Sequence, residues 1–418
     1  MNYPRMIRIR QNFDAPTLDD ITCTVRHELT KLNLSNKIKI GDSVAISVGS
    51  RGIANIALIV KILVEALKAH GAQPFIVPSM GSHGGGTAEG QRAIVEGYGV
   101  TEAYTGAPIK ATMEVVQVGI TEDGLPVYFD KYAYEANHVV VVGRIKPHTE
   151  FSGEIESGLH KMMLIGLGKH KGATLYHQAI ISYSFDRIIH SIAKSVIEKC
   201  KILLGLAIIE NPNHETALIE ALNPESFYKR EKELLILAKK WMPRLPFKQV
   251  DLLIVDQIGK DISGDGMDTN VIGRKYLIHK AADHEYPKIT RIYVRDLTEL
   301  TYGNATGMGI AEYAHTQLIN KIDFEDTYIN CNIANVPTSA AIPIHFDTDK
   351  KVLDAALNTI GYIQPKDARI IRIRHTSDIK EIMVSEIYQR EMDGRDDLSI
   401  IELAKEMVFN DNDNLLPF

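Results

Sequence analysis

The chain has 418 residues, of which 45% are hydrophobic and 24% charged, and its formal net charge at pH 7 is −6. This length predicts two domains, and the composition favours a folded chain without long disordered segments. The acidic balance argues against nucleic acid or an anionic membrane as a partner. Three well-separated cysteines, Cys23, Cys200 and Cys331, predict neither a disulfide framework nor a thiolate zinc site.

The first residues lack the apolar core of a signal peptide. The most apolar helical pattern, near residues 56–67, is interrupted by Lys61 and Glu65. It is too short and too charged to cross a bilayer. We therefore expect a soluble, cytoplasmic protein.

In the first half of the chain, apolar runs typical of buried parallel strands alternate with amphipathic helical patterns. Thr87 is the expected N-cap of one of these helices. The alternation predicts an α/β fold, in which helices cover both faces of a mainly parallel sheet. The expected strands are residues 43–49, 73–79, 138–145 and 201–209, and the expected helices are residues 53–71, 88–99 and 184–200.

A domain boundary is predicted near residues 241–251, where two prolines follow a long charged helix. The N-terminal α/β domain would then span 1–245 and the C-terminal α/β domain 250–384. The last segment, 385–418, is compatible with either domain and is provisionally joined to the first. In the second domain we expect strands at residues 250–257, 289–297 and 368–375, and helices at 310–322 and 350–361.

Ligands of parallel α/β sheets bind beyond the carboxyl ends of the strands. Three polar, Gly-rich loops follow such strands, around Arg51, around His83 and from Gly143 onward. Residues 143–177 hold four of the fifteen histidines, together with several lysines and glycines. This concentration of imidazoles and amines predicts a chemical site.

Each candidate residue has both a functional and a structural interpretation. His83, in GSHGGGT, lies either at an anion-binding loop or on a surface turn. His148 either titrates at a cleft or caps a strand end. Lys161 has apolar neighbours and is either a chemically used amine or a snorkelling side chain. His177 is either a metal ligand or a core residue, and Arg51 either binds a carboxylate or forms a surface ion pair.

The second domain contains the polar loop KDISGDGMDTNVIGR. Asp268, Asn270 and Arg274 are its candidate pocket residues, although their spacing does not match an EF-hand. The alternative is that these residues only build the loop. A GxSxG elbow, an HExxH motif and a CxxC motif are all missing, so the usual serine-hydrolase and zinc-hydrolase interpretations lack support.

Taken together, GSHGGG, KPHTEFSGEIESGLHK and the His177 spacing resemble the nickel-pincer-nucleotide-dependent lactate racemase family. The resemblance implies two α/β domains with mainly parallel sheets and an active-site cleft between them. It makes His83 and His148 the two catalytic histidines and Lys161 the covalent tether of the nucleotide. It also makes His177 the nickel ligand and Arg51 a substrate-carboxylate residue. Ser50, Gly81 and Gly158 are the further cofactor positions that it implies.

The cofactor implied is the nickel pincer nucleotide, pyridinium-3,5-bisthiocarboxylic acid mononucleotide with nickel, supplied by cofactor-synthesis proteins. The reaction implied is racemisation or epimerisation of a 2-hydroxy acid by reversible proton-coupled hydride transfer. Two positions depart from the family pattern. Val48 replaces an aspartate before Arg51, and the second-domain loop around Asp268 lacks the Gln…Lys pair expected to contact lactate. The substrate therefore stays open.

Two other functions are compatible with the same residues. The first is a metal-dependent hydrolase or lyase without the nucleotide, with zinc on His83, His148 and His177. The second is a non-catalytic anion-binding homologue, in which GSHGGGT forms the binding loop. A covalent mass addition separates the nucleotide enzyme from both.

Overall fold

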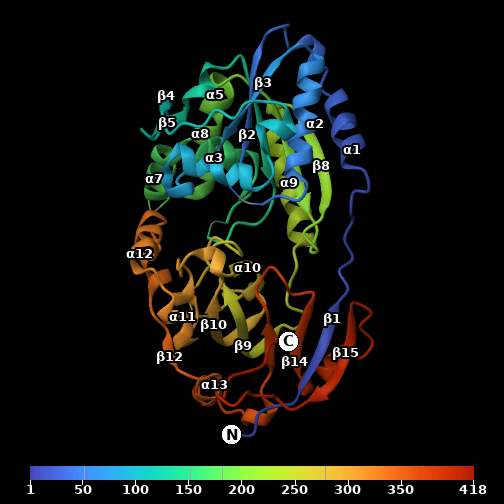
Figure 1. Ribbon diagram of the computed structural model, residues 1–418, viewed down its shortest axis with the longest axis vertical. Coiled ribbons are helices and arrows are strands. Elements are labelled where there is room, and N and C mark those ends of the chain that lie inside the picture. The colour runs from blue at the N-terminus through green and yellow to red at the C-terminus, as the bar shows by residue number, and fades with distance from the viewer. Residues whose placement is uncertain (51, 151, 181, 278) are drawn as a thin grey trace. The chain divides into compact units, whose positions relative to one another are not determined.

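The computed structural model describes residues 1–50, 52–150, 152–180, 182–277 and 279–418. The chain forms two compact units, which Figure 1 colours by residue number. The large unit is Ala15–Met242, and the split unit combines Met1–Asp14 with Pro243–Phe418. Each unit is an α/β structure built on its own sheet.

The main sheet of the large unit has the strand order β3-β2-β6-β7-β8. The first four strands run parallel, and β8 pairs antiparallel with β7. The parallel strands place the loops that follow β2, β3 and β6 at one edge of the sheet. The strands of this unit are β2 (Ser43–Val48), β3 (Gln73–Pro78), β4 (Val115–Ile120), β5 (Pro126–Asp130), β6 (His138–Arg144), β7 (Ile202–Glu210) and β8 (Thr216–Leu222).

Both faces of this sheet are buried, as the uninterrupted apolar runs predict. In β6, Val140 and Val142 face a core shared with α1, α2 and α3. Val139 and Val141 face the opposite core, which α5, α7, α8 and α9 close. In chain order the helices are α1 (Ile21–Thr30), α2 (Ile56–Ala69), α3 (Ala88–Gly97), α4 (Glu102–Thr105), α5 (Lys131–Glu135), α6 (Leu159–Lys161), α7 (Lys169–Ala179), α8 (Phe185–Lys199) and α9 (Phe227–Trp241).

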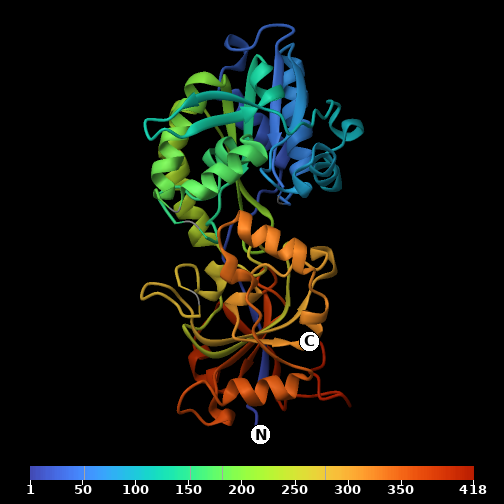
Figure 2. The same ribbon diagram turned by 90° about the vertical axis from the view of Figure 1, so that its left-hand side faces the viewer.

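Side-chain caps define where several of these helices begin. Thr87 accepts a hydrogen bond from the Gly90 amide at the start of α3, as the sequence predicted. Ser184 caps α8 in the same way, through the Arg187 amide. The antiparallel β4–β5 ribbon packs on α7 and α8 and is visible beside these green helices in Figure 2.

The described part of the split unit contains a sheet with the order β12-β11-β10-β9-β13-β14-β1-β15. In this order, the strands from β12 through β11, β10 and β9 to β13 run parallel. The strands β14, β1 and β15 continue the sheet by antiparallel pairing. The strands are β1 (Met6–Gln11), β9 (Gln249–Ile258), β10 (Lys288–Leu297), β11 (Tyr313–His315), β12 (Ile344–Phe346), β13 (Ile370–Ile373), β14 (Glu381–Ser385) and β15 (Leu398–Lys405). The helices are α10 (Thr269–Ile272), α11 (Thr316–Asn320), α12 (Phe324–Ile333), α13 (Asp349–Leu357) and α14 (Gln389–Met392).

The division between the units falls after Met242, within three residues of the expected limit at 245. Two parts of the expected division were wrong. Residues 1–14 belong to the split unit, because β1 pairs with β14 and β15. Residues 385–418 also belong there and not to the N-terminal domain, because β15 forms the outer edge of the same sheet.

The helix expected at residues 310–322 was also wrong in its first half. Tyr313 and Ala314 lie in β11, which pairs with β10 on one side and β12 on the other. Both side chains are buried, so tertiary pairing outweighs the helical spacing of the apolar residues. Only the second half of the segment, Thr316–Asn320, is helical.

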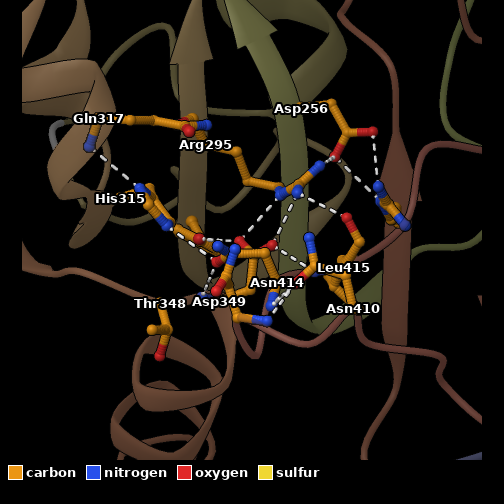
Figure 3. A network of polar contacts seen from close by, with 12 residues as sticks. Asp256, Arg295, His315, Gln317, Thr348, Asp349, Asn410, Asn414 and Leu415 are labelled. Atoms are coloured by element: carbon orange, nitrogen blue, oxygen red, sulfur yellow. Dashed lines mark hydrogen bonds and ion pairs between the residues drawn. The ribbon is translucent and has the colours of Figure 1, made fainter.

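A network of charged side chains ties the split unit together (Figure 3). Arg295 donates to both carboxylate oxygens of Asp349 and to Asp256, and Arg372 bonds Asp256 from the neighbouring strand β13. The Leu415 amide donates to Asp349, which fixes the last segment of the chain on this network.

None of the helices in the described residues is both long and apolar enough to cross a membrane.

Candidate active site

The loop that carries His83 connects β3 to α3 in the large unit. It needs glycine at several positions, because Gly81, Gly84, Gly85 and Gly86 all have positive φ angles between 60° and 67°. The His83 amide donates to the Met80 carbonyl, and the side chain is partly buried. The backbone therefore holds His83 at the carboxyl end of a parallel strand, where α/β folds bind ligands.

Lys161 ends the short helix α6, and a π-helix, Met162–Gly166, follows it directly. Such π-helical turns are rare in proteins, and those that do occur are frequently found at functional sites. The lysine is partly buried, between the buried residues His160 and Met163. After the π-helix the chain continues into α7, which carries His177 in its last turn.

The His83 loop packs directly against the segment that joins Lys161 to His177. The Gly81 amide approaches the Gly166 carbonyl at 3.5 Å. A Cβ atom at Gly81 would lie 3.1 Å from Ile165 Cγ2 and 3.2 Å from Ala173 Cβ, so a larger residue would separate the two segments. This close packing brings the loop of His83 to the middle of α7.

Lys161 and His177 interact electrostatically. Burial and, to a smaller extent, the positive charge of Lys161 together lower the pKa of His177 from 6.5 to about 4. His177 is therefore neutral at pH 7, and neutral imidazole is the form that binds a metal. An amine and a metal-competent imidazole thus lie close enough to influence one another.

His148 lies in the loop after β6, and two backbone contacts fix it. Its amide donates to the buried Glu156 carboxylate at 2.8 Å, and its Nδ1 accepts from the Glu150 amide at 3.0 Å. Lys239 of α9 forms an ion pair with Glu156 at 2.7 Å. Because Nδ1 accepts a hydrogen bond, the neutral ring of His148 carries its proton on Nε2.

The remaining positions expected in this unit differ in how well they are defined. Ser50 follows β2, and its carbonyl accepts a hydrogen bond from Tyr98 at 2.6 Å. Gly158 is buried, and a Cβ there would lie 2.0 Å from Glu231 Oε1, so only glycine fits. Arg51 lies outside the described residues.

The expected residues of the split unit serve the loop locally. Asp268 caps α10 by accepting from the Asn270 amide at 3.0 Å, and the Asn270 side chain donates to the same oxygen at 2.9 Å. The assignment of Arg274 to a substrate pocket was wrong. Its side chain is 3% exposed, donates to the Ile310 carbonyl and pairs with Glu312 at 2.9 Å.

Sequence reasoning missed several buried polar residues around these loops. Lys169 looked solvated in the sequence but is fully buried, and Gln91 is buried beside it. Glu156 and Glu231 are also buried, and each bonds the backbone of a histidine, His148 and His160 respectively. A local polar pattern contains no signal for this burial, because partners from distant segments create it.

A pocket of about 520 Å³ lies beside α3, between its first turns and residues 109–111. Its lining residues include Arg92, Lys110 and Tyr132. The four candidate residues of this unit do not line it, namely His83, His148, Lys161 and His177. In the described part of the chain, no group of three or more His, Cys, Asp or Glu side chains is arranged to hold a metal ion. The three histidines that the zinc alternative requires thus do not form a preassembled cluster.

Comparison with known proteins finds one matching domain family. Residues 12–186 match the model of the lactate racemase N-terminal domain. This part of the chain is therefore similar to a lactate racemase N-terminal domain. It contains His83, His148, Lys161 and His177 within the matched range. None of the curated proteins that were compared matches the chain.

Solved structures extend the likeness in fold over both units. The lactate racemase apoprotein from Thermoanaerobacterium thermosaccharolyticum aligns with a TM-score of 0.55 at 14% identity, over 89% of this chain and 98% of that one. A protein from Thermotoga maritima aligns with a TM-score of 0.46 at 11% identity, over 78% and 82% of the two chains. The first comparison confirms the expected α/β fold with mainly parallel sheets.

Proposed function

We propose that the chain is a racemase or epimerase that acts on a 2-hydroxy acid. In this proposal the enzyme carries a nickel pincer nucleotide tethered to Lys161. The matched lactate racemase N-terminal domain supports the reaction class. The observation that carries the proposal is the pairing of Lys161 with His177 on one α6–π-helix–α7 segment. We propose this amine as the tether and this imidazole as the nickel ligand.

The residues present fit such a group. Lys161 is partly buried, so its side chain is not completely removed from solvent. On α7, one turn before His177, the buried Thr174 Oγ1 has no hydrogen-bond partner in the described residues. Buried hydroxyls are normally satisfied, and a bound polar group would satisfy this one. We assign Ser50, Gly81 and Gly158 to the same cradle.

When bound, the nickel nucleotide supplies a reversible hydride acceptor. His83 and His148 then accept and return the proton of the substrate hydroxyl group, and each histidine serves one enantiomer. General acid–base assistance of this kind is worth about 10²–10⁴-fold in rate. Two histidines suit a racemase, because the hydroxyl group of each enantiomer approaches from a different side of the reacting carbon.

The geometry of His148 gives it a defined starting state. With Nδ1 accepting from the Glu150 amide, Nε2 carries the proton and can donate to a keto oxygen. To accept a hydroxyl proton at Nε2, the ring must release the Glu150 amide and move its own proton to Nδ1. With the Glu150 contact in place, the Nε2–H group can only hydrogen-bond a keto oxygen, because loss of this proton would leave an imidazolate. His148 therefore transfers a proton in either direction only after this local rearrangement, when Nδ1 holds a proton and Nε2 exchanges one with the substrate oxygen.

The substrate class rests on the family and on carboxylate recognition. We propose Arg51 as the residue that binds the carboxylate, and Asp268 and Asn270 as residues that set the size of the acid accepted. Partners in this proposal are the 2-hydroxy acid and the proteins that synthesise and deliver the nucleotide.

The decisive experiment is intact-mass spectrometry of protein co-produced with the cofactor-synthesis enzymes. The wild-type chain should gain the nucleotide mass and interconvert the enantiomers of at least one 2-hydroxy acid, whereas Lys161→Ala should show neither. Lys171→Ala is the matched control, because Lys171 is an exposed lysine on α7 whose Nζ lies 4.4 Å from the Tyr128 ring centroid. It should keep both the mass and the activity.

Metal analysis of the same samples separates the alternatives. About one nickel per chain, lost together with the mass addition in Lys161→Ala, supports the proposal. Zinc without added mass would favour the hydrolase or lyase. Thermal stabilisation by 2-hydroxy acids without turnover would favour a binding protein.

A further inference from the structure

Lys169 is a fully buried cation with three acceptors around its ammonium group. Its Nζ donates to the Pro78 carbonyl, donates to Gln91 Oε1 at 3.1 Å and lies 3.1 Å from Asp130 Oδ2. Lys169 and Asp130 are both 0% exposed. The ammonium group therefore donates two hydrogen bonds to neutral oxygens, and the Asp130 carboxylate forms an ion pair with it.

The backbone directs this side chain inward. Lys169 has a φ of 56°, a left-handed conformation that costs a residue with a Cβ atom roughly 1–2 kcal/mol. It follows Gly168, where a Cβ would lie 2.1 Å from the Leu164 carbonyl oxygen. The junction between the π-helix and α7 thus has an unfavourable backbone conformation, and its result is a buried ammonium group.

The lysine determines how the Gln91 amide is oriented. An ammonium group only donates, so the Gln91 oxygen must face Lys169 and the amide nitrogen must face away from it. That nitrogen donates to the Gly81 carbonyl at 2.8 Å and to the His83 carbonyl at 3.3 Å. A chain of bonds therefore runs from Asp130 through Lys169 and Gln91 to the loop of His83.

The same chain of bonds joins the two sides of the candidate site. Lys169 is the first residue of α7, whose last turn carries His177. Its contact with Pro78 holds the end of β3, where the His83 loop begins. The loop has four glycines with positive φ and needs contacts from outside to restrict it to one conformation.

Stability alone does not account for this arrangement. Replacing a buried ion pair by apolar side chains of similar volume is often neutral or stabilising by about 1–4 kcal/mol. Asp130 also caps α5 through the Ala133 amide, but an uncharged asparagine oxygen could accept that bond equally well. What the lysine adds is a fixed direction for the Gln91 amide.

We propose that Lys169 and Gln91 are positioning residues that hold the His83 loop against α7, with Asp130 as the counter-ion. This rests on the proposed role of His83 in the reaction. The network acts by fixing two carbonyls of the loop, and neither side chain touches the substrate. Loosening it should impair the proton transfer step more than substrate binding.

The test is hydrogen exchange of the metal-free protein, followed over the peptide that covers residues 79–87. Gln91→Glu keeps an acceptor for Lys169 but removes the donor to Gly81 and His83. We expect exchange in this peptide to accelerate about tenfold, as for the loss of one or two hydrogen bonds, with no change in β2 or α2. Gln117→Glu, an exposed glutamine on β4, is the matched control and should not differ from wild type.

Two further measurements complete the test. Lys169→Met/Asp130→Asn should give the same local acceleration while the protein stays folded, which covers the case in which Gln91→Glu does not fold. The imidazole NMR signal of His83 should shift or broaden in both variants. In loaded enzyme, kcat should fall at least tenfold with KM within twofold of wild type.

Unchanged exchange at residues 79–87 in a folded variant would overturn the proposal, as would acceleration spread evenly over the large unit. The exchange and NMR measurements need neither nickel nor substrate. If the wild-type chain takes up no nucleotide and is inactive, the proposed function fails while the positioning result still stands on its own.

Discussion

The two units bury charge in different ways. In the split unit, Arg295 contacts Asp256 and Asp349, and Arg372 shares Asp256, so each charge is neutralised by a partner on another strand or helix (Figure 3). In the large unit, Lys169 has one carboxylate, Asp130, and its other two partners are neutral oxygens. The two guanidinium groups and two carboxylates of the first network balance one another, so we call it the closed network, and it also holds the last segment at Leu415. The second network leads into the loop of His83.

The difference shows what each network does. The closed network joins strands β9, β10 and β13 to helix α13. Its loss should therefore lower the stability of the whole split unit. An open network that leads to the Gly81 and His83 carbonyls limits the motion of one short segment. The closed network therefore supports the fold of the split unit, and we propose that the Lys169 network of the large unit supports the candidate site.

The largest expected effect comes from breaking the closed network. Burial opposes ionisation of Asp349, but its hydrogen bonds with Arg295 outweigh this and lower its pKa. Asp349→Ala leaves a mostly buried guanidinium without this partner, so the free energy of unfolding of the split unit should fall by about 3–5 kcal/mol. Urea denaturation followed by circular dichroism measures this change.

Asp347→Ala is the control for this variant, because Asp347 lies two residues earlier and forms an exposed pair with Lys351. It should leave the urea midpoint unchanged. If the two variants unfold at the same midpoint, the closed network does not stabilise the split unit. Exchange of residues 79–87 in the large unit should be normal in both variants.

The next effect is a pH dependence confined to the large unit. His177 has a folded pKa of about 4 and an ordinary value of 6.5, so the unfolded chain binds the proton more tightly. Above pH 6.5 both states are neutral there and nothing is lost. As pH falls from about 6.5 to about 4, this residue should remove up to about 3 kcal/mol of stability.

NMR titration of the metal-free protein measures this pKa directly, and His177→Gln should remove the corresponding part of the stability loss. Lys161→Met should raise the pKa of His177, because it removes the positive charge beside it. An ordinary titration of His177 near pH 6.5 in the wild type would show that the imidazole is not buried, and an unchanged pKa in Lys161→Met would show that the two residues do not lie together.

The smallest expected effect is a difference in stability between two glycine variants of the His83 loop. This difference separates the contribution of packing from that of backbone conformation. Gly81→Ala adds a Cβ atom close to Ile165 and Ala173 at a φ of 60°, and should cost about 2 kcal/mol. Gly85→Ala has a similar φ of 64° but open space around it, and should cost about 1 kcal/mol. Urea unfolding of both variants gives the difference, and equal losses would mean that the loop does not pack on α7.

Much of the fold was predictable because its signals are local. The apolar runs of β2, β3, β6 and β7 and the cap at Thr87 are visible in the printed sequence, and the structure has these elements at nearly the expected bounds. The grouping of candidate residues on loops after parallel strands also follows from strand direction alone. Substrate-contacting roles for Asp268 and Asn270 stay predictions.

Other features depend on partners distant in the sequence. Residues 310–322 have helical spacing, yet β11 forms there because strands lie on both sides of it. Lys169 and Arg274 have the polarity of surface residues, yet both are buried. The local spacing of apolar and polar residues reflects backbone preference and exposure to solvent. This information was enough to predict strands, helices and the position of a site. Whether a charge is buried depends on which acceptors the folded chain brings around it, so only the tertiary structure could decide that Lys169 is enclosed by Pro78, Gln91 and Asp130.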